Sequence, residues 1–582
     1  MSCFTRLAMP AISVAFRWAT RYVVVAVVAI GLLFGDNSKI SPDLLPLLSN
    51  SSSSFNVIVQ YNSPPQTCTS GGLLGGLLCT TVNLLGGLVK VVFSLLNAVA
   101  ATLTGSEVIN LSNQSNVNYI SLDRTVAGSL DYTAAAVSAP YAWSSGLDGS
   151  GVGVAIIDSG IYSHPDLTTR SGWGSRVVYR QSFIGGSKYD DFGHGTHVAG
   201  IVGGNGATSS KPGSFRLLKG IAPNANLVDL RVLDLNGAST DSVVIAAIEK
   251  AVKLKSQYNI RVINLSLGRP IHESCAKDPL CQAVEAAWAN GIVVVTAAGN
   301  LGRNGYATVL SPGNSPHAIT VGAMKTEATM STSDDLIASY SSKGPTFIDL
   351  TAKPDVVAPG NLVVSLLAPG STLANEFPAN VIAPSYYTTS TYGNSPAYFR
   401  LSGTSMATPV VSGAVALMLQ KDPTLNPDTV KARIMKTAGK QFPLTSVAVD
   451  PTTGIAYPST YDMFTVGAGY LNIAAALQNY DRAYGSSASP QVIYNSLQQT
   501  AYLVANPALI WFSSPTWNSS VAWGSTVLQS TSAGTTIWDS SVAWGSSVAW
   551  GTSVAWGSSV AWGSSVAWGS SVAWGTSGQG EK

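Results

Sequence analysis

Charged residues are scarce in this 582-residue sequence, and their signs nearly balance. The 32 basic and 30 acidic side chains make up 11% of the chain and leave a net charge of +2, whereas about 25% of a typical soluble domain is charged. No run of basic residues is longer than two. A nucleic-acid-binding surface needs concentrated positive charge, so we expect no nucleic acid among the partners.

Low charge alone would also suit a disordered linker. However, 46% of the residues are hydrophobic, which excludes disorder over most of the chain. The length corresponds to roughly four segments. The composition therefore indicates a large globular protein that is secreted or associated with a membrane.

Cysteine is rare as well, with five residues. Cys3 lies in the N-terminal segment, and the others form two closely spaced pairs, Cys68 with Cys79 and Cys275 with Cys281. Two even pairs suggest two disulfides formed in an oxidising compartment, although reduced, buried thiols would give the same spacing. A zinc site is not expected, because neither pair has a second CxxC or an HxxxH partner.

The N-terminus has the order of a secretory signal. Arg6, Arg17 and Arg21 precede the apolar run 22–34, which is shorter than the roughly 20 residues of a membrane-spanning helix. No clean A-x-A cleavage site follows. We therefore predict that residues 1–35 are a signal peptide, with a retained membrane anchor as the alternative.

Residues 54–130 predict a small α/β unit. Strands are expected at 55–61 and 118–122, and a helix is expected at 91–103. Between them, residues 71–89 form an uncharged Gly/Leu-rich insertion. A soluble insertion is favoured over a membrane hairpin, because glycine pairs and a polar centre interrupt the apolar run.

Residues 137–478 alternate apolar strands with amphipathic helices. Strands are expected at 152–157, 226–230, 262–267 and 292–297, and helices include 242–254 and 281–290. Strands that are apolar on both faces indicate a parallel sheet covered by helices on both sides. This segment is the predicted core domain.

The pattern fades after residue 478, and we interpret residues 479–540 as a linker. From 541 to 576 the hexapeptide SSVAWG or TSVAWG repeats in tandem, and an earlier copy is centred on Trp523. In a β conformation the even period would place every Val and Trp on one face. Such a stripe favours docking on a surface or self-association.

Three motifs predict one catalytic site. VAIIDSG at 154–160 delivers Asp158 at the end of a strand, HGTHVAG at 194–200 places His194 at a helix start, and SGTSMATP at 402–409 places Ser405 at another. Alone, Asp158 could be a turn residue and Ser405 an N-cap. A serine nucleophile needs a base, and the base needs an orienting carboxylate, so together the three favour catalysis. His197 is expected to be structural.

With these motifs the chain resembles the subtilisin family of serine peptidases (subtilases). The resemblance covers residues 137–478 and implies a doubly wound parallel α/β sheet flanked by helices. It also implies a catalytic triad of Asp158, His194 and Ser405. Asn300, in AAGN, matches the side chain that stabilises the oxyanion.

The resemblance further implies how substrate binds. Ser266, Leu267 and Gly268 match the strand that pairs with an extended peptide, and the segment ending at Gly237 matches the opposite rim. Backbone pairing confers little sequence preference, so broad specificity is expected. The apolar residues around Leu267 suggest a hydrophobic pocket, and a disulfide at Cys275 could stiffen its rim.

Asp166 fits a calcium ligand of the same family. The loop 204–219 lacks the carboxamide-rich segment that would complete that site. The sequence therefore leaves two interpretations open, a calcium ligand and a plain helix or turn cap. No cofactor is required for the predicted chemistry.

The 54–130 unit resembles the family's inhibitory propeptide, although the Gly/Leu-rich insertion departs from its pattern. We expect processing between Asp123 and Ala136 to release the mature enzyme. The predicted function is an exported, self-processing serine endopeptidase that acts on proteins or peptides, secreted or held at the cell surface through its N-terminus or its repeats.

The alternative is a structural or adhesive surface protein that acts through its Trp repeats and is only trimmed by the peptidase domain. If the catalytic hypothesis holds, His194 must be neutral to act as a base. With a pKa near the reference of about 6.5, activity should fall below about pH 6.

Overall fold

The computed structural model describes residues 35–41, 44–49, 51–63, 88–93, 97–122, 129–185, 189–390, 395–450, 454–495, 500–523, 529–531 and 534–538. The chain divides into two compact units, Met1–Val126 and Ala127–Lys582. Residues 1–34 of the predicted signal, residues 71–87 of the Gly/Leu-rich insertion, Cys68, Cys79 and the tandem repeats lie outside the described residues.

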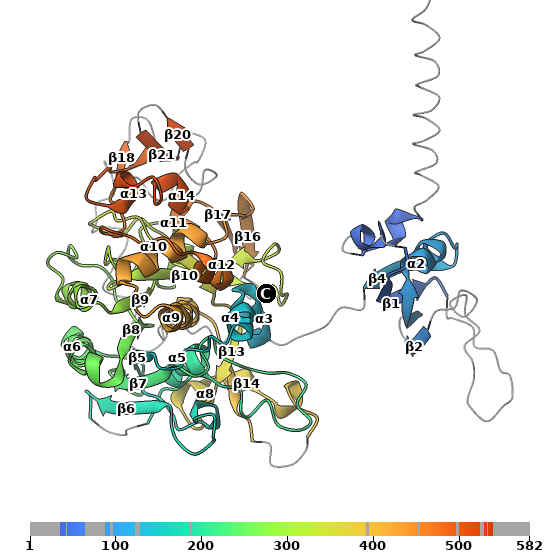
Figure 1. Cartoon of the computed structure of the whole chain (residues 1–582), viewed down its shortest axis with the longest axis horizontal. Helices are drawn as coiled ribbons and strands as arrows, with labels where there is room; N and C mark the ends of the chain where they lie inside the picture. Colours follow the sequence, from blue (N-terminus) through green and yellow to red (C-terminus); the bar gives the residue numbers. More distant parts are fainter. Residues whose placement is uncertain are drawn as a thin grey trace, which may run out of the picture. The chain divides into compact units, whose positions relative to one another are not determined.

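The described part of the first unit is a four-stranded antiparallel sheet with one α-helix and two short 3₁₀-helices (Figure 1). The strand order is β2-β3-β1-β4. A capping box formed by Thr104 and Glu107 starts helix α2 directly after β3, which satisfies two of the free N–H groups of the first turn. The elements are η1 Asn37–Lys39, η2 Leu45–Ser49, β1 Ser54–Tyr61, β2 Leu88–Phe93, β3 Ala98–Thr104, α2 Gly105–Ser112 and β4 Val117–Leu122.

The predicted helix at 91–103 is wrong, whereas the strands predicted at 55–61 and 118–122 are confirmed. The stretch forms the end of β2 and most of β3, which pair as antiparallel neighbours. Val99, Ala101 and Leu103 alternate into the core of this unit. A period of two, with β-branched residues that suit a pleated surface, therefore prevails over the apolar run that resembled a helix.

The second unit is built on an eight-stranded sheet with the order β11-β10-β9-β8-β5-β7-β6, in which β12 also pairs with β10. All pairs are parallel except that of β10 with the short β11. The four predicted strands correspond to β5, β7, β8 and β9. The bounds are β5 Gly153–Asp158, β6 Val177–Ser182, β7 Asn226–Arg231, β8 Ile260–Leu265, β9 Val293–Ala297, β10 Ile319–Lys325, β11 Leu336–Ile337 and β12 Val356–Pro359.

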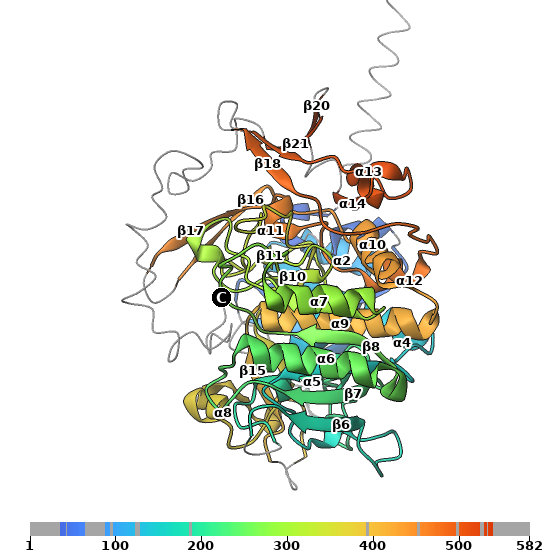
Figure 2. The same ribbon diagram turned by 90° about the vertical axis from the view of Figure 1, so that its left-hand side faces the viewer.

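Helices cover both faces of this sheet, which confirms the predicted doubly wound α/β fold. Helices α5 (His194–Gly203) and α9 (Thr404–Lys421) lie on one face, and α6 (Asp241–Tyr258) and α7 (Pro279–Ala289) lie on the other (Figures 1 and 2). Strand β5 shows why: Val154 and Ile156 join the core beneath α5 and α9, while Ala155 and Ile157 join the core beneath α6 and α7. Both faces of the strand are buried, as its continuous apolar sequence requires.

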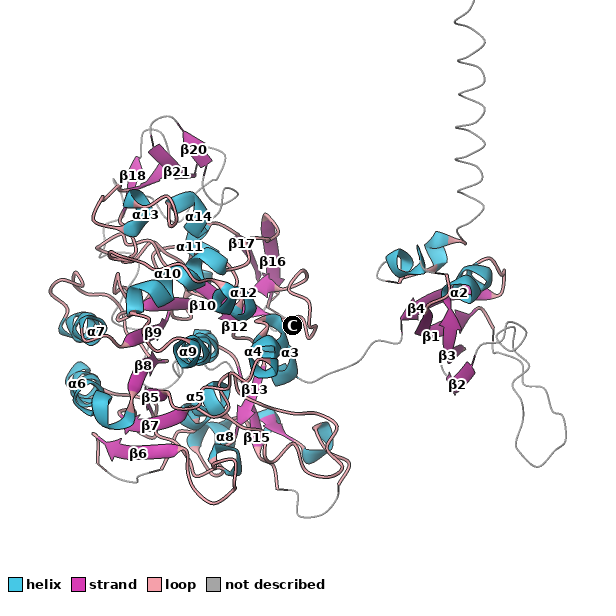
Figure 3. Ribbon diagram, viewed as in Figure 1, coloured by secondary structure: helices cyan, strands magenta, loops and turns pink. Residues whose placement is uncertain are grey.

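Short elements surround this core (Figure 3). They include a three-stranded sheet β13-β15-β14 and a hairpin β16-β17. Among the described residues, no helix combines the length and apolar character needed to cross a bilayer. The bounds are α3 Ser129–Ala136, α4 Ala139–Ser144, η4 Pro165–Leu167, η5 Gly302–Asn304, β13 Val363–Leu366, α8 Thr372–Glu376, η6 Pro378–Asn380, β14 Val381–Ile382, η7 Pro384–Tyr386, β15 Tyr398–Leu401, α10 Pro427–Thr437, β16 Thr445–Val449, β17 Ala456–Thr460, α11 Met463–Val466 and α12 Ile473–Gln478.

The interpretation of residues 479–540 as a linker is wrong for the described residues between 479 and 523. Trp511, Trp517 and Trp523 are at most 2% exposed and share a core with Met435 and Phe464, which belong to the predicted core domain. Three large aromatic side chains bury enough apolar surface to fix a segment whose helices and strands are too short to show periodicity. Its elements are β18 Val492–Asn495, β19 Thr500–Leu503, α13 Ile510–Ser513, α14 Ser519–Trp523, β20 Gln529–Thr531 and β21 Gly534–Trp538.

Candidate active site

Asp158 is the last residue of β5, at the carboxyl end of a central strand. Its side chain is fully buried. The Oδ1 atom accepts hydrogen bonds from the backbone N–H of Ser159 at 2.8 Å and from Nδ1 of His194 at 2.7 Å. Asp158 therefore keeps a proton on Nδ1 of His194, so that Nε2 is the nitrogen without a proton in the neutral ring.

His194 is the first residue of α5, and glycines on either side of it allow this position. Gly193, the residue before the helix, has φ 100°, a conformation that favours glycine. A Cβ on Gly195 would lie 2.2 Å from the carbonyl oxygen of Gly160 and 3.2 Å from Cβ of Asp158. The absence of a side chain at 195 therefore lets the helix start approach the end of β5.

A second buried carboxylate holds the loop that carries His194. Asp190 accepts the backbone N–H groups of Gly193 and Thr196, each at 2.7 Å, and the hydroxyl of Ser159 at 2.8 Å. The same Ser159 oxygen accepts the N–H of Gly195 at 2.8 Å. Asp190 and Ser159 thus connect the residue after Asp158 to the residues around His194.

The electrostatics of His194 set two effects against each other. Burial disfavours the imidazolium, but the charges of Asp158 and Asp190 and the hydrogen bond to Asp158 outweigh it, so the pKa of His194 lies above its usual value of 6.5. Its Nε2 atom is buried and has no hydrogen-bond partner among the described residues. A basic nitrogen without a partner is suited to accept a proton from a nearby hydroxyl.

His197 has the structural role that the sequence predicted. Its Nε2 lies 3.1 Å from the carbonyl oxygens of both Val363 and Phe399, so it carries the proton and donates. Burial, and then the neighbouring His194, lower the pKa of His197 to about 3. It is therefore a neutral histidine that ties α5 to β13 and β15.

Ser405 is the second residue of α9 and is 3% exposed. The N-cap position belongs to Gly403, so the alternative interpretation of Ser405 as an N-cap is wrong. Its hydroxyl donates to the carbonyl oxygen of Ser266 at 3.1 Å. The hydroxyl of Ser266 in turn donates to the carbonyl oxygen of Ser405 at 2.9 Å.

Proline explains the second of these bonds. The carbonyl of Ser405 would normally accept the N–H of residue 409, but Pro409 has none. Pro409 lies inside the helix, at its sixth residue and beyond the first turn. Ser266 replaces the missing donor and so joins the end of β8 to the start of α9.

Asn300 follows β9 and has a fixed amide orientation. Its Oδ1 accepts the backbone N–H of Thr404 at 2.9 Å and the hydroxyl of Thr404 at 3.2 Å. Because a backbone N–H can only donate, the oxygen must face Thr404 and the NH₂ group must face away. The Thr404 hydroxyl also accepts the N–H of Gly299 at 3.1 Å, which fixes the position of both residues.

The predicted substrate-binding residues lie beside these groups. Ser266 contacts Ser405 directly, and Leu267 and Gly268 continue the chain beyond β8. The backbone groups of Leu267 and Gly268 make no backbone hydrogen bond to another described residue, as expected of an edge that an extended peptide could join. Gly237 lies in a turn whose backbone packs against the ring of Phe192.

The surroundings of Asp166 do not fit a calcium site, one of the two interpretations that the sequence left open. Its carboxylate oxygens accept the N–H of Thr208 and the hydroxyl of Tyr398, both at 2.7 Å. Calcium needs oxygen ligands, not donors, and the described residues contain no group of three His, Cys, Asp or Glu that could hold a metal. Asp166 lies inside η4, whose cap is His164, so it is not a cap either.

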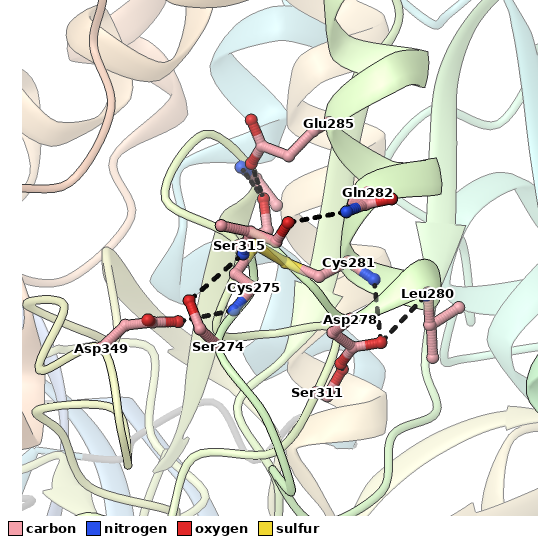
Figure 4. Close-up of a disulfide and its surroundings, with 12 residues drawn as sticks. Ser274, Cys275, Asp278, Leu280, Cys281, Gln282, Glu285, Ser311, Ser315 and Asp349 are labelled. Atoms are coloured by element: carbon pink, nitrogen blue, oxygen red, sulfur yellow. Dashed lines mark hydrogen bonds between the residues drawn. A yellow bond between two sulfur atoms is a disulfide. The ribbon is translucent and has the colours of Figure 1, made fainter.

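A disulfide joins Cys275 and Cys281, with their Cα atoms 5.2 Å apart. It closes the loop that leads into α7 (Figure 4). Asp278 caps that helix, accepting the N–H of Leu280 at 2.9 Å and the hydroxyl of Ser311 at 2.7 Å. Since residue 311 pairs with Arg269 in the segment after Gly268, the loop is attached to the predicted substrate strand.

Three residues of the site were not found from the sequence. Asp190 and Ser159 position the loop of His194, and Thr404 positions Asn300. Each acts on a partner that is distant along the chain or reached only through a backbone group. The sequence signal for Asp190 was its place in the acidic pair Asp190–Asp191 before HGTHVAG. The sequence does not show which of these two carboxylates is buried.

Comparisons with known proteins identify a family to which the chain is similar. A family model described as the subtilase family matches residues 149–489. Serine protease AprX of Bacillus subtilis (strain 168) is 40% identical over 353 residues, covering 58% of this chain and 73% of that protein. Subtilisin E of the same organism is 35% identical over 393 residues, covering 66% and 82%.

Two further matches are similar in extent. The alkaline protease of Shouchella clausii is 33% identical over 351 residues, covering 60% of this chain and 75% of that protein. A crystal structure of a cold-adapted subtilisin-like serine proteinase is 28% identical, with a TM-score of 0.37, and the match covers 51% of this chain and 85% of that chain.

Proposed function

The chain belongs to the subtilase family and is a serine-type endopeptidase, and from this premise we propose that Ser405, His194 and Asp158 are its catalytic triad. The observation that carries the proposal is the 2.7 Å hydrogen bond between Nδ1 of His194 and Asp158. It leaves Nε2 buried and without a described partner, in the state that a general base requires.

In the proposed reaction, the hydroxyl of Ser405 leaves its resting bond to the Ser266 carbonyl and attacks the carbonyl carbon of a peptide substrate. Nε2 of His194 takes the hydroxyl proton and later gives it to the leaving amine. Asp158 stabilises the imidazolium that forms in between. Water then repeats the sequence on the acyl-enzyme and releases Ser405.

The oxyanion of the tetrahedral intermediate would be stabilised by two donors. One is the NH₂ group of Asn300, which the bond from Thr404 turns away from α9. The other is the backbone N–H of Ser405, in the first turn of α9, where the helix dipole favours negative charge. Both donors are held before the substrate arrives, which is the arrangement that contributes most to such catalysis.

Protein or peptide substrates would bind as extended chains along residues 266–268, opposite the rim at Gly237. Backbone pairing there supports broad specificity, and the buried side chain of Leu267 supports an apolar pocket. A panel of peptides with acidic, basic and aromatic residues before the cleaved bond tests this preference. A strong preference for basic residues would contradict it.

We further infer that the enzyme is exported as a zymogen. Support comes from the apolar N-terminal segment, the disulfide and the separate compact unit that ends at Val126. The border of that unit falls within the interval 123–136, where we expect processing. The first unit would act as an inhibitor until it is cut away.

The first test compares the intact masses of the wild type and Ser405→Ala after secretion from the same host. We expect a product of mature length from the wild type alone, because only it has the nucleophile for self-cleavage. Mature product from both would mean that another protease does the cutting. Full-length protein from both would contradict autoprocessing.

A further inference from the structure

One copy of the hexapeptide unit is part of the folded structure. Residues 519–524 read SSVAWG, as the tandem copies do, and Ser519–Trp523 form the one-turn helix α14. Trp523 is 1% exposed and meets Trp511 edge to face, with ring centroids 5.3 Å apart. This copy is neither a strand nor a solvent-exposed linker.

The surface that holds this copy is made by the peptidase unit. Helix α14 packs against α10 and α13 (Figure 1), and Ala432 and Met435 of α10 belong to the same apolar cluster as Trp523. The ammonium group of Lys440 donates to the carbonyl oxygen of Ala522 at 2.6 Å. We call the surface formed by Ala432, Met435, Lys440 and Trp511 the tryptophan site.

The docked segment begins before the hexapeptide copy, at Trp517. Trp517 lies six residues before Trp523 and is 2% exposed. Its ring lies 5.1 Å from the ammonium nitrogen of Lys436, and its Nε1 donates to the carbonyl oxygen of Arg482 at 3.4 Å. Two buried tryptophans at a spacing of six therefore anchor the copy at both ends.

The tandem copies repeat the sequence of this docked segment, including both tryptophans, with differences at the second and third positions. Residues 517–523 read WNSSVAW, and each window from 538–544 to 568–574 has the same form, with Asp or Gly at the second position and one Thr at the third. At the second position the carbonyl of Asn518 accepts the N–H of Ala522 at 2.9 Å, and every residue type has that group. The side-chain amide of Asn518 also donates to the carbonyl oxygen of Pro515 at 3.2 Å, a bond within the segment that Asp or Gly would not make. The bond from Lys440 also reaches a carbonyl, at an alanine that each copy retains.

We propose that the tryptophan site is a receptor for the Trp-x-Ser/Thr-Ser-Val-Ala-Trp unit, and that the array at 541–576 supplies alternative occupants that exchange with residues 517–523. One chain carries one such receptor and several ligands, so surplus copies can occupy the sites of other molecules. Exchange replaces the contacts of the two tryptophans and of the alanine carbonyl by equivalent contacts. It is therefore governed by effective concentration and by the number of copies.

The test uses the full chain with Ser405→Ala, which prevents self-digestion. One variant adds Trp517→Ala with Trp523→Ala, a second removes the array tryptophans, and a third combines both sets. The array set replaces Trp544, Trp550, Trp556, Trp562, Trp568 and Trp574 by Ala. Trp173→Ala is the matched control, because its side chain is 93% exposed.

We expect each set alone to leave the thermal midpoint nearly unchanged, because a remaining copy fills the site. The combined variant should lose roughly 5 °C, since no copy keeps the pair of tryptophans that anchors the segment in the site. A loss in the Trp517/Trp523 variant alone that equals the combined loss, or a failure of that variant to fold, would overturn the proposal. No loss in the combined variant would overturn it as well.

A synthetic peptide gives an independent readout. Adding WGSSVAWG to the combined variant should raise its midpoint saturably, as binding to the folded state does. The same peptide with both tryptophans replaced by Ala should have no effect. Equal effects of the two peptides, or no effect of either, would overturn the proposal, and catalysis plays no part in the measurement.

Discussion

The charge on His194 is decided by its closest neighbours. As the first residue of α5, it lies at the positive end of a helix, which favours the neutral imidazole. A helix end carries only about half an elementary charge, whereas Asp158 contacts the ring at 2.7 Å and Asp190 adds a second negative charge. The two carboxylates therefore outweigh both the helix and burial.

This environment predicts the acid side of the pH profile. Below its pKa, His194 is an imidazolium and cannot accept the proton of Ser405, so the acid limb of kcat/KM should lie above pH 6.5, higher than the sequence alone suggested. Asp190→Asn should move that limb to lower pH, because it removes a charge that favours the imidazolium. Asp191→Asn is the control, since this more exposed carboxylate pairs with Arg231. An unchanged limb in Asp190→Asn would contradict the assignment.

A second prediction concerns the hydroxyl of Thr404, whose removal should lower kcat and leave KM nearly unchanged. Thr404→Val removes the hydroxyl that donates to Asn300 and accepts the N–H of Gly299, so the oxyanion donor loses its support. We expect kcat to fall roughly 10-fold with KM nearly unchanged, less than the roughly 10²–10³-fold loss that follows removal of such a donor. Thr404→Ser should restore most of the turnover. Equal losses in kcat from Ser and Val would contradict a role for the hydroxyl.

The residues that perform the proposed chemistry could be predicted from the sequence, whereas those that position them could not. A nucleophile, a base and an oxyanion donor each require a particular residue type, so Ser405, His194 and Asn300 stand out in their motifs. Thr404 and Asp190 act through hydrogen bonds whose partners are brought together only by the fold. Asp166 shows the converse, because its motif matched a metal site while its neighbours supply donors.

At the scale of elements, Pro409 makes the start of helix α9 depend on a contact with the end of strand β8. Pro409 leaves the carbonyl of Ser405 without its helical donor, and Ser266 supplies a hydroxyl in its place. Helix α9 therefore depends on β8 at the residue proposed to be the nucleophile. A motif such as GTSMATP shows the proline but does not show which residue replaces the missing N–H.

A double-mutant cycle tests this replacement. Ser266→Ala should lower the free energy of unfolding by roughly 1–3 kcal/mol, because a buried carbonyl loses its partner. Adding Pro409→Ala restores an N–H at residue 409, so Ser266→Ala should cost less in that background. Denaturant unfolding of Ser405→Ala versions would measure both costs. Equal costs in the two backgrounds would contradict the explanation.

The elements that were misjudged share a physical cause. The stretch 91–103 is apolar enough for either structure, and the pairing of β3 with β1 and β2 decides the outcome. The segment after residue 478 has described helices of four and five residues, too short for a period of 3.6 to appear. In both cases tertiary contacts, and not local sequence, determine the structure.

At the scale of the whole chain, the segment after residue 478 is joined to the peptidase domain through buried charges. Asp355 accepts from the ammonium group of Lys353 at 2.6 Å and lies 3.0 Å from that of Lys431. Ser489, from the C-terminal segment, donates to Asp355 at 2.6 Å and accepts from Lys431 at 2.9 Å. All four side chains are at most 5% exposed, so this cluster should unfold together with the segment it holds.

Asp355→Asn should therefore destabilise the peptidase unit by roughly 3–5 kcal/mol, because two buried ammonium groups lose their counter-charge. Glu249→Gln is the matched control. It breaks an exposed pair with Lys253, whose loss should cost less than about 1 kcal/mol.

Urea unfolding of Ser405→Ala versions would be followed by circular dichroism and by tryptophan fluorescence, which reports strongly on the segment from Trp511 onward. Both signals should shift together to lower urea in Asp355→Asn, whereas an earlier shift in fluorescence alone would mean that the segment unfolds independently of the sheet.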